Sequence, residues 1–149
     1  MRLNCGSGTD VKPGFINLDC RDIEGVTRCD VSDPAAMEAY RGAGLILAYD
    51  VLEHFDRKQA RSVLAMWIDL LAPGGEIRIR CPDFRYACSL HQVDSWVELL
   101  LYGGQDYDEN HHKCGFTIEM LTRLLEGLGV EVTGARHTTA GNLEIEAVK

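Results

Sequence analysis

Strand-like apolar runs alternate with longer helix-like runs along the whole 149-residue chain. This alternation is typical of one α/β domain, which we expect to span residues 1–149 around a largely parallel β-sheet. The short link 139–142 predicts that the last two strands form an antiparallel hairpin. The expected strands are Arg2–Cys5, Phe15–Cys20, Val26–Val31, Leu45–Asp50, Glu76–Cys81, Val130–Thr138 and Leu143–Val148.

Three expected helices begin at residues that commonly cap helices. Asp33 is followed by proline, Asp56 starts a capping-box pattern, and Thr117 precedes a leucine-rich run. Between the last two caps, residues 84–102 are expected to be helical in part. Residues 103–115 are polar and rich in Asp, Asn and His, which predicts a loop.

The first two connections between strands are too short to hold helices. Residues 9–14 and residues 21–25 form these connections, whereas a parallel crossover normally takes about a dozen residues or more. Only the three later crossovers have room for helices, and right-handed crossovers place those helices on one face. We therefore expect helices mainly on one face of the sheet, with the first crossover helices truncated.

The opposite face of the sheet is expected to be polar, because charged side chains recur at every second position of two strands. Either these side chains form cross-strand ion pairs that face water, or the face contacts a second copy of the chain in a homodimer. An uncovered face is unusual for a parallel sheet, so we favour the homodimer. The side chains are Arg78, Arg80, Glu144 and Glu146.

Charge and hydropathy limit the partners of this chain. Fifteen Lys and Arg residues against 23 Asp and Glu residues give a net charge of −8. A field of this sign repels phosphate backbones and anionic membranes, which argues against nucleic acid or a membrane as partner. No apolar run approaches the roughly 20 residues of a membrane span, and the first residues lack a signal-peptide core. We expect a cytoplasmic protein.

The six cysteines include no closely spaced pair, and in a chain without an export signal we expect reduced thiols. A zinc site would need ligands whose spacing is irregular here, unlike the tight pairs of structural zinc sites. We therefore expect no metal. The ligands considered are Cys81, Cys88 and His91 with His111, His112 and Cys114.

A glycine-rich turn, Cys5-Gly6-Ser7-Gly8, closes the first expected strand. Small residues at the carboxyl end of a parallel strand let a ligand approach the backbone. The dinucleotide-binding pattern does not fit, because Val11 replaces its third glycine and Asp19 follows Gly8 too closely to be its acidic residue. With no full helix after the turn to bind a pyrophosphate, a ligand without phosphates fits better.

Two acidic residues end the second and third expected strands. Asp19 could accept hydrogen bonds from two ribose hydroxyls. Asp30 could accept from an adenine amino group, while the amide of Val31 donates to a ring nitrogen. Either aspartate alone could simply be a turn residue. Together, the glycine-rich turn, Asp19 and Asp30 end three consecutive strands with groups suited to a nucleoside, which favours a nucleoside ligand.

Five segments of the chain occur in a familiar order: Leu3-Asn4-Cys5-Gly6-Ser7-Gly8, Pro13-Gly14-Phe15-Ile16-Asn17-Leu18-Asp19, Asp50-Val51-Leu52-Glu53-His54-Phe55, Leu71-Ala72-Pro73-Gly74-Gly75 and His112-Lys113-Cys114-Gly115-Phe116-Thr117. Together they resemble the class I S-adenosylmethionine-dependent methyltransferases, especially small predicted members associated with glycan biosynthesis.

The resemblance implies a Rossmann-like methyltransferase sheet of strand order 3-2-1-4-5-7-6, in which the last strand is antiparallel. It also implies that S-adenosyl-L-methionine binds over the carboxyl ends of strands one to four. The implied cofactor-binding residues are Cys5, Gly6, Ser7, Gly8, Asp19, Asp30, Val31, Asp50 and Val51.

We expect methyl transfer to a hydroxyl or carboxyl group of a small molecule such as a sugar. His54, His112 and Glu53 are the candidate catalytic residues, because a hydroxyl nucleophile needs a base and an imidazole titrates near neutral pH. Alternatively, Glu53 and His54 only orient their loop, and His111 is a further candidate base. The acceptor pocket is expected to include Arg85, Trp96, Tyr102 and Tyr107.

Two alternatives to a small-molecule methyltransferase remain. The chain could be a non-catalytic module that binds S-adenosylmethionine or its demethylated product and regulates a partner protein. It could also bind a nicotinamide. The Asn/Asp-Pro-Pro-aromatic tetrapeptide of enzymes that methylate nucleic-acid amines is replaced by Asp50-Val51-Leu52-Glu53, which further argues against a nucleic-acid acceptor.

Overall fold

The computed structural model describes residues 1–90, 95–138 and 141–149. Its strands are β1 (Arg2–Cys5), β2 (Ile16–Asp19), β3 (Thr27–Arg28), β4 (Ala43–Tyr49), β5 (Leu71–Pro82), β6 (Glu131–His137) and β7 (Asn142–Val148). Its helices are α1 (Pro34–Met37), α2 (Arg57–Leu70), α3 (Phe84–Ser89), α4 (Ser95–Tyr102) and α5 (Ile118–Glu126), with 3₁₀ turns η1 (Glu38–Tyr40) and η2 (Leu52–His54).

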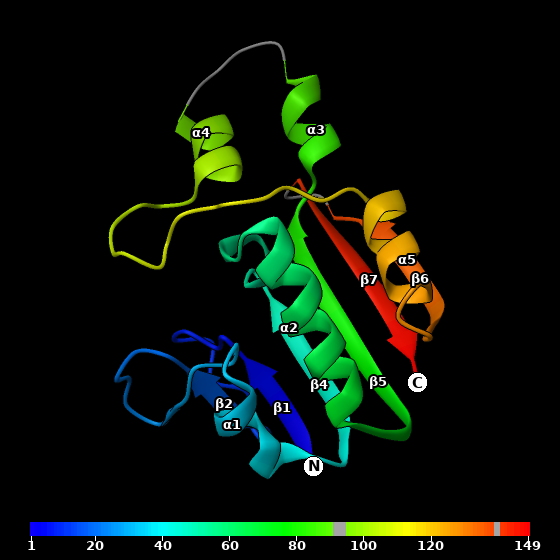
Figure 1. Cartoon of the computed structure of the whole chain (residues 1–149). Helices are drawn as coiled ribbons and strands as arrows, with labels where there is room; N and C mark the ends of the chain where they lie inside the picture. The colour runs from blue at the N-terminus through cyan, green and yellow to red at the C-terminus, as the bar shows by residue number, and fades with distance from the viewer. Residues whose placement is uncertain (91–94, 139–140) are drawn as a thin grey trace.

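The strands form one seven-stranded sheet in the order β3-β2-β1-β4-β5-β7-β6 (Figure 1). Neighbours from β3 to β5 run parallel, and β7 is antiparallel to both β5 and β6. The α/β class, the strand order and the C-terminal hairpin expected from the sequence are confirmed. Residues 139 and 140 of the hairpin link lie outside the described residues.

The predicted helix starts are also confirmed. The side chain of Asp33 accepts a hydrogen bond from the amide of Ala35, and that of Thr117 accepts one from Met120. Asp56 accepts from the amides of Lys58 and Gln59, and the Gln59 side chain returns a bond to the Asp56 amide. These bonds satisfy first-turn amides that have no partner inside the helix.

Two strands differ from the sequence prediction. β3 is only two residues long, because the chain turns after Arg28 and the Asp30 carbonyl accepts a hydrogen bond from Asp33 at the start of α1. β5 begins at Leu71 rather than Glu76, because Leu71 already pairs with Ala43 across an irregularity in the ladder. The Pro-Gly-Gly turn therefore lies within the strand's span and does not separate it from α2.

The helices α1, α2 and α5 cover the same face of the sheet (Figure 1). Along β1, β4, β5 and β7, the side chains that point toward the helices alternate with outward-pointing ones and are almost fully buried. Among the described residues, no helix covers the opposite face, so the expected one-sided arrangement is confirmed. The core side chains on this face include Leu3, Cys5, Ile46, Ala48, Ile77, Ile79, Leu143 and Ile145.

The charged side chains of the uncovered face form ion pairs with partners other than those expected. The register places Arg78 opposite Glu146 and Arg80 opposite Glu144. Arg78 instead pairs with Glu76 on its own strand, while Arg80 reaches Asp50 beyond the end of β4. The two glutamates pair with Arg136 on the edge strand β6, where one guanidinium nitrogen contacts Glu144 and the other contacts Glu146.

Within the described residues, no helix is long and apolar enough to cross a membrane.

Candidate functional site

The turn after β1 lies at the carboxyl end of the parallel strands. The amide of Ser7 donates to the carbonyl of Leu18, and the amide of Gly8 donates to the Asp19 carboxylate at 2.8 Å. Gly6 has φ +63° and packs so closely on Val51 that a Cβ would overlap that side chain. Glycine is therefore required here for both conformation and space.

Two pockets flank this turn. One has a volume of about 480 Å³ and contains Ser7, Gly8, Glu53 and His112 in its wall. The other has a volume of about 320 Å³ and contains Asp19, Asp30, Val31 and Val51. We call them the larger and the smaller pocket. They share a wall formed by Gly6, Arg21, Asp50, His54 and Tyr107.

The predicted cofactor-binding residues mostly line these pockets, with one exception. The side chain of Cys5 is fully buried on the helix-covered face and lines neither pocket. Asp30 is exposed and accepts hydrogen bonds from the amide and hydroxyl of Ser32. Val31 is held in place by the Trp67 indole, which donates to its carbonyl at 2.9 Å.

Asp19 is buried, and both of its carboxylate oxygens accept hydrogen bonds. One accepts from Gly8, and the other accepts from the amide and the guanidinium Nε of Arg21, each at 3.0 Å. Burial raises the pKa of Asp19, but the hydrogen bonds from Arg21 and Gly8 outweigh it, and the net pKa lies below its ordinary value of 3.8.

Arg21 also stacks on the ring of Tyr107, with its guanidinium carbon 4.3 Å from the ring centroid. This contact joins the second strand connection to the polar loop 103–115, and it lies in the wall shared by both pockets. Arg21 was not predicted as a site residue from the sequence. The one local signal was a cation two residues after a strand-end carboxylate.

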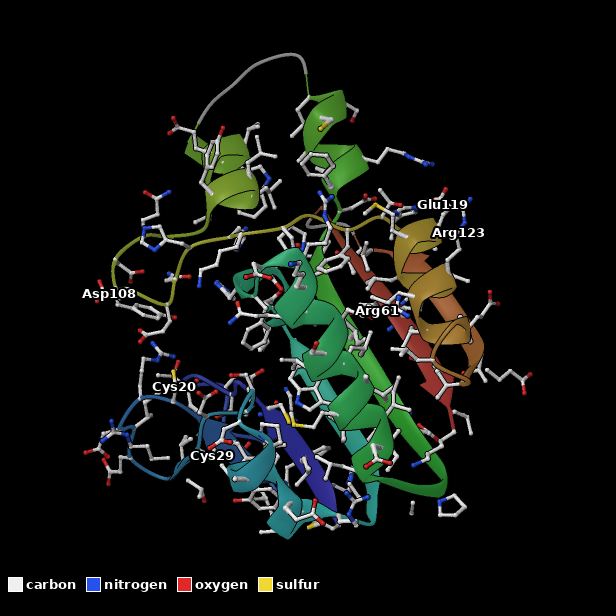
Figure 2. The ribbon with its side chains drawn as sticks, in the orientation of Figure 1. Cys20, Cys29, Arg61, Asp108, Glu119 and Arg123 are labelled. Atoms are coloured by element: carbon white, nitrogen blue, oxygen red, sulfur yellow. The ribbon has the colours of Figure 1, made fainter. Side chains whose placement is uncertain are left out.

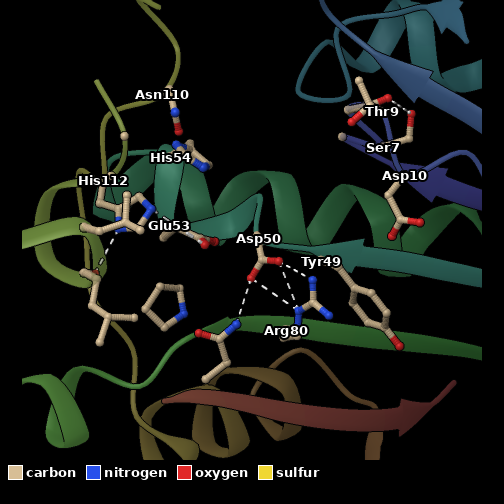
Figure 3. Close-up of a pocket in the computed structure, with 18 of the residues that line it drawn as sticks. Ser7, Thr9, Asp10, Tyr49, Asp50, Glu53, His54, Arg80, Asn110 and His112 are labelled. Atoms are coloured by element: carbon tan, nitrogen blue, oxygen red, sulfur yellow. Dashed lines mark hydrogen bonds and ion pairs between the residues drawn. The ribbon is translucent and has the colours of Figure 1, made fainter. Parts of the chain in front are cut away.

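Asp50 follows β4 with φ +57°, a left-handed conformation that is uncommon outside glycine. Its carboxylate pairs with Arg80 and accepts a hydrogen bond from the side chain of Asn142 at 3.3 Å (Figure 3). The guanidinium of Arg80 lies over the ring of Tyr49. These contacts fix the carboxylate where the two pockets meet.

Glu53, His54 and His112 lie together in the structure (Figure 3). Each offers a nitrogen or oxygen ligand atom, and these atoms lie within 4.8 Å of one another. The His112 Nε2 is 4.0 Å from the Glu53 Oε1, and the two imidazole centroids are 4.9 Å apart. The predicted catalytic residues are therefore neighbours, although His112 is far from the others in sequence.

Backbone hydrogen bonds bring the two segments together. The carbonyl of Glu53 in η2 accepts from the amides of Lys113 and Cys114. The amide of His112 donates to the carbonyl of Tyr102, which ties the polar loop back to α4. The loop residues next to His112 are thus anchored to the turn that carries Glu53 and His54.

Each imidazole uses one nitrogen to bond the backbone. His54 Nδ1 is 3.3 Å from the carbonyl of His111, and His112 Nδ1 is 3.0 Å from the carbonyl of Leu100. A carbonyl can only accept, so each Nδ1 carries the hydrogen and each neutral ring has its lone pair at Nε2. Burial lowers the pKa of both rings below 6.5, and His112 lowers that of His54 further.

Glu53 is 2% exposed, and neither of its carboxylate oxygens has a hydrogen-bond partner among the described residues. Burial raises its pKa well above its ordinary value of 4.5, and the charge of Asp50 adds to this effect. A buried polar group without a partner is costly in a protein. Its position in the wall of the larger pocket therefore points to an interaction with something bound there.

Only some of the residues expected in the acceptor pocket line the larger pocket. Trp96 and Tyr107 line the larger pocket. Arg85 lines neither pocket, because it pairs with Glu119 of α5 at 2.8 Å, and Figure 2 shows Glu119 on the outer side of that helix. Tyr102 is 57% exposed and also lies outside both pockets.

The zinc ligand set considered from the sequence does not gather in the described part of the chain. Cys81 is buried beneath α2 and α5, whereas Cys88 is exposed on α3. His91 lies outside the described residues. Among the residues described, the group that places metal-ligand atoms together is instead Glu53, His54 and His112.

No protein-family model matches this sequence, and no curated protein is similar to it. Solved structures are similar in fold. A 1,6-didemethyltoxoflavin-N1-methyltransferase from Burkholderia thailandensis, solved with 1,6-didemethyltoxoflavin and S-adenosylhomocysteine, has a TM-score of 0.70 at 19% identity. The match covers 99% of this chain and 70% of that one.

Two further structures extend this likeness. A SAM-dependent methyltransferase from Archaeoglobus fulgidus has a TM-score of 0.70 at 14% identity, over 99% of this chain and 85% of that one. Human N-acetylserotonin methyltransferase, solved with SAM, has a TM-score of 0.66 at 16% identity, over 99% of this chain and 47% of that one. At these identities the matches establish a Rossmann-like methyltransferase fold, as the resemblance implied.

Proposed function

We propose that this protein is an S-adenosylmethionine-dependent methyltransferase. The observation that carries the proposal is the meeting of two pockets at Gly6, Asp50 and His54, one with strand-end carboxylates and the other with a Glu-His-His group. Ligands of α/β sheets bind at this edge, outside the carboxyl ends of the strands. The fold shared with solved methyltransferases supports the same assignment.

The residues of the smaller pocket fit the cofactor's nucleoside. Asp19 would accept from the ribose hydroxyls, Asp30 from the adenine amino group, and the Val31 amide would donate to the ring. Val51 and Phe55 supply apolar wall. The turn Gly6–Gly8 would lie beneath the methionine part, with Asp50 on the sulfonium side.

The larger pocket would hold the acceptor, which we propose is a hydroxyl or carboxyl group of a small molecule such as a sugar. The cofactor supplies a methyl group on a sulfonium, so that the acceptor oxygen attacks carbon while the C–S electron pair stays on sulfur. Alignment of the reactants can lower the activation barrier by about 7–11 kcal/mol. Glu53, His54 and His112 border this pocket, and an imidazole Nε2 would accept the hydroxyl proton. General base catalysis of this kind typically raises the rate by about 10²–10⁴-fold.

Calorimetry with S-adenosylmethionine and S-adenosylhomocysteine tests this proposal first, followed by a methyl-transfer assay over a panel of sugars and other hydroxyl and carboxyl metabolites. Binding followed by turnover of one acceptor supports the enzyme. Binding without turnover of any acceptor favours a non-catalytic module that regulates or completes a partner. Absence of binding contradicts both, and a fluorescence titration with NADH then tests the nicotinamide alternative.

We also propose that two copies pair through the uncovered face of the sheet. Arginines and glutamates alternate there, and a two-fold axis can bring the cations of one copy to the anions of the other. Sedimentation velocity over a range of concentrations should find a dimer that dissociates at high salt. A monomer at every concentration would contradict this pairing. The charged residues concerned are Arg78, Arg80, Glu144 and Glu146.

A further inference from the structure

We propose that Glu53, His54 and His112 bind a divalent transition-metal ion such as Zn²⁺. This inference deepens the proposed function, because the ion would lie in the wall of the larger pocket where the acceptor is placed. It also revises the expectation from the sequence, in which His112 was considered as a ligand with cysteines and other histidines, but Glu53 and His54 were not.

The three side chains supply a suitable ligand set. Two imidazole nitrogens and one carboxylate oxygen are the protein ligands of several catalytic zinc sites, and imidazole also suits iron, nickel and copper. Ligands at about 2.0–2.2 Å from one ion lie roughly 3.0–3.5 Å apart. The corresponding atoms here lie within 4.8 Å of one another, so small side-chain rotations bring them to that spacing.

The histidines are already oriented as metal ligands usually are. Metal-bound histidines commonly donate the other ring N–H to a carbonyl or carboxylate, which fixes the tautomer. His54 and His112 each donate Nδ1–H to a backbone carbonyl, which leaves Nε2 as the available ligand atom.

Glu53 gives independent support, because its carboxylate is buried and aimed into the group without a partner. Arg80, a cation near Glu53, is instead paired with Asp50. A cation would satisfy both the hydrogen-bonding capacity and the charge of Glu53.

Three protein ligands leave coordination positions open toward the pocket. An acceptor oxygen bound there would lose its hydroxyl proton more easily, since a metal ion lowers the pKa of a bound hydroxyl or water. The metal–oxygen bond forms, the O–H electron pair stays on oxygen, and the proton leaves to pocket water. When the ion is bound, the imidazoles act as ligands and the ion replaces them in activating the acceptor.

Titration of chelator-stripped protein with Co²⁺ tests the site directly, because bound Co²⁺ absorbs visible light. We expect one ion per chain, displaced by Zn²⁺, without the near-ultraviolet band of a thiolate ligand. A thiolate band would place the ion on a cysteine and overturn the proposal, as would the absence of Co²⁺ binding.

Substitutions test the ligand assignment. Glu53→Gln and His54→Gln should each weaken Co²⁺ affinity by about 100-fold or more, since even supporting residues of metal sites typically contribute 10–100-fold. His111→Gln is the matched control, because this exposed neighbour lines neither pocket and should keep the affinity. Equal loss in the control, or full affinity in both ligand variants with native circular dichroism, would overturn the assignment.

The failure of this inference can be told apart from failure of the proposed function. Co²⁺ binding is measured without any nucleoside, and S-adenosylhomocysteine binding is measured in chelator. Co²⁺ binding without nucleoside binding would leave the metal site standing and contradict the methyltransferase. Nucleoside binding with full turnover in chelator would support the methyltransferase and contradict the metal proposal.

Discussion

Arginines pair with two of the carboxylates that border the pockets. Arg21 occupies Asp19, and Arg80 occupies Asp50. Such pairing fixes the direction of each carboxylate before a ligand arrives, which lowers the ordering cost of binding. At Asp19, ribose hydroxyls must either share the carboxylate with Arg21 or displace Arg21 from it. If they displace it, Arg21 and the Tyr107 ring stacked on it are expected to move when a ligand fills the smaller pocket.

Replacing Asp19 should weaken binding of the cofactor. Asp19→Ala removes the charged acceptor of the ribose hydroxyls, which should cost about 1.5–3 kcal/mol of binding free energy, so the dissociation constant for S-adenosylhomocysteine should rise roughly 10- to 150-fold. Calorimetry measures the change. Asp22→Ala is the control, because Asp22 is exposed and lines neither pocket. Unchanged affinity in Asp19→Ala would refute the ribose assignment.

Asp19 should also make stability depend on pH. Its folded pKa lies below the ordinary value, so its contribution is complete above pH 3.8 and is lost as the pH falls through the folded pKa. Asp19→Asn should therefore be less stable than the native chain by about 1–3 kcal/mol at pH 7. Urea unfolding should find a smaller difference at pH 3. A difference that stays constant with pH would contradict the charged state of Asp19.

Among the elements, α2 is the one whose boundaries are best explained by local interactions. Its capping box starts the helix at Asp56, and its apolar face packs Val63, Leu64 and Trp67 against the sheet. The Trp67 indole also bonds the carbonyl of Val31. This one helix therefore connects the core to a backbone segment of the smaller pocket.

Removing the cap of α2 should destabilise the chain measurably. Asp56→Ala leaves the amides of Lys58 and Gln59 without their acceptor, which should cost about 0.5–2 kcal/mol in the free energy of unfolding. Chemical denaturation monitored by circular dichroism gives the value. Lys58→Ala, an exposed first-turn substitution that keeps the cap, should change stability by a few tenths of a kcal/mol. If Asp56→Ala costs no more stability than Lys58→Ala, the capping box does not contribute to the stability of the chain.

At the level of the complete fold, the core lies on one side of the sheet. Helices cover only that side in the described residues, and the other side consists of side chains such as Tyr49, Arg78 and Arg136. The connections after β1 and β2 hold no helix that could cover this face, so the uncovered face extends up to the glycine-rich turn. Anything that covers this face, a second copy included, would therefore lie close to the larger pocket.

Neighbouring residues of β4 give a matched test of this asymmetry. Ile46 is fully buried on the helix-covered face, and Leu45 is partly exposed between Arg2 and Glu76 on the other face. Ile46→Ala should lower the free energy of unfolding by about 2–5 kcal/mol, the usual cost of a core truncation. Leu45→Ala should lower it by less than half as much in dilute urea unfolding. Equal costs would contradict a one-sided core.

Local patterns were sufficient to predict the class of the fold, the helix caps and the positions of most strands. Alternation with period two identified the buried face, because successive side chains of a strand point to opposite sides. The turn Gly6–Gly8 and Asp19 were identifiable from where the first two strands end. Asp30 lies two residues beyond the short β3, and Asp50 was implied by the resemblance to a known family. The order of the strands required resemblance to a known family.

Contacts between distant segments were not predictable in this way. Arg80 bonds Asp50 instead of the glutamate opposite it, and Arg21 stacks on Tyr107, because the lengths and paths of loops decide which long side chains reach each other. The isolation of the Glu53 carboxylate and the approach of His112 depend on how loop 103–115 folds back onto η2. Residue types and spacing specified the pieces of the site through short-range sterics and hydrogen bonding, whereas packing of separate segments in space set their charges, partners and distances.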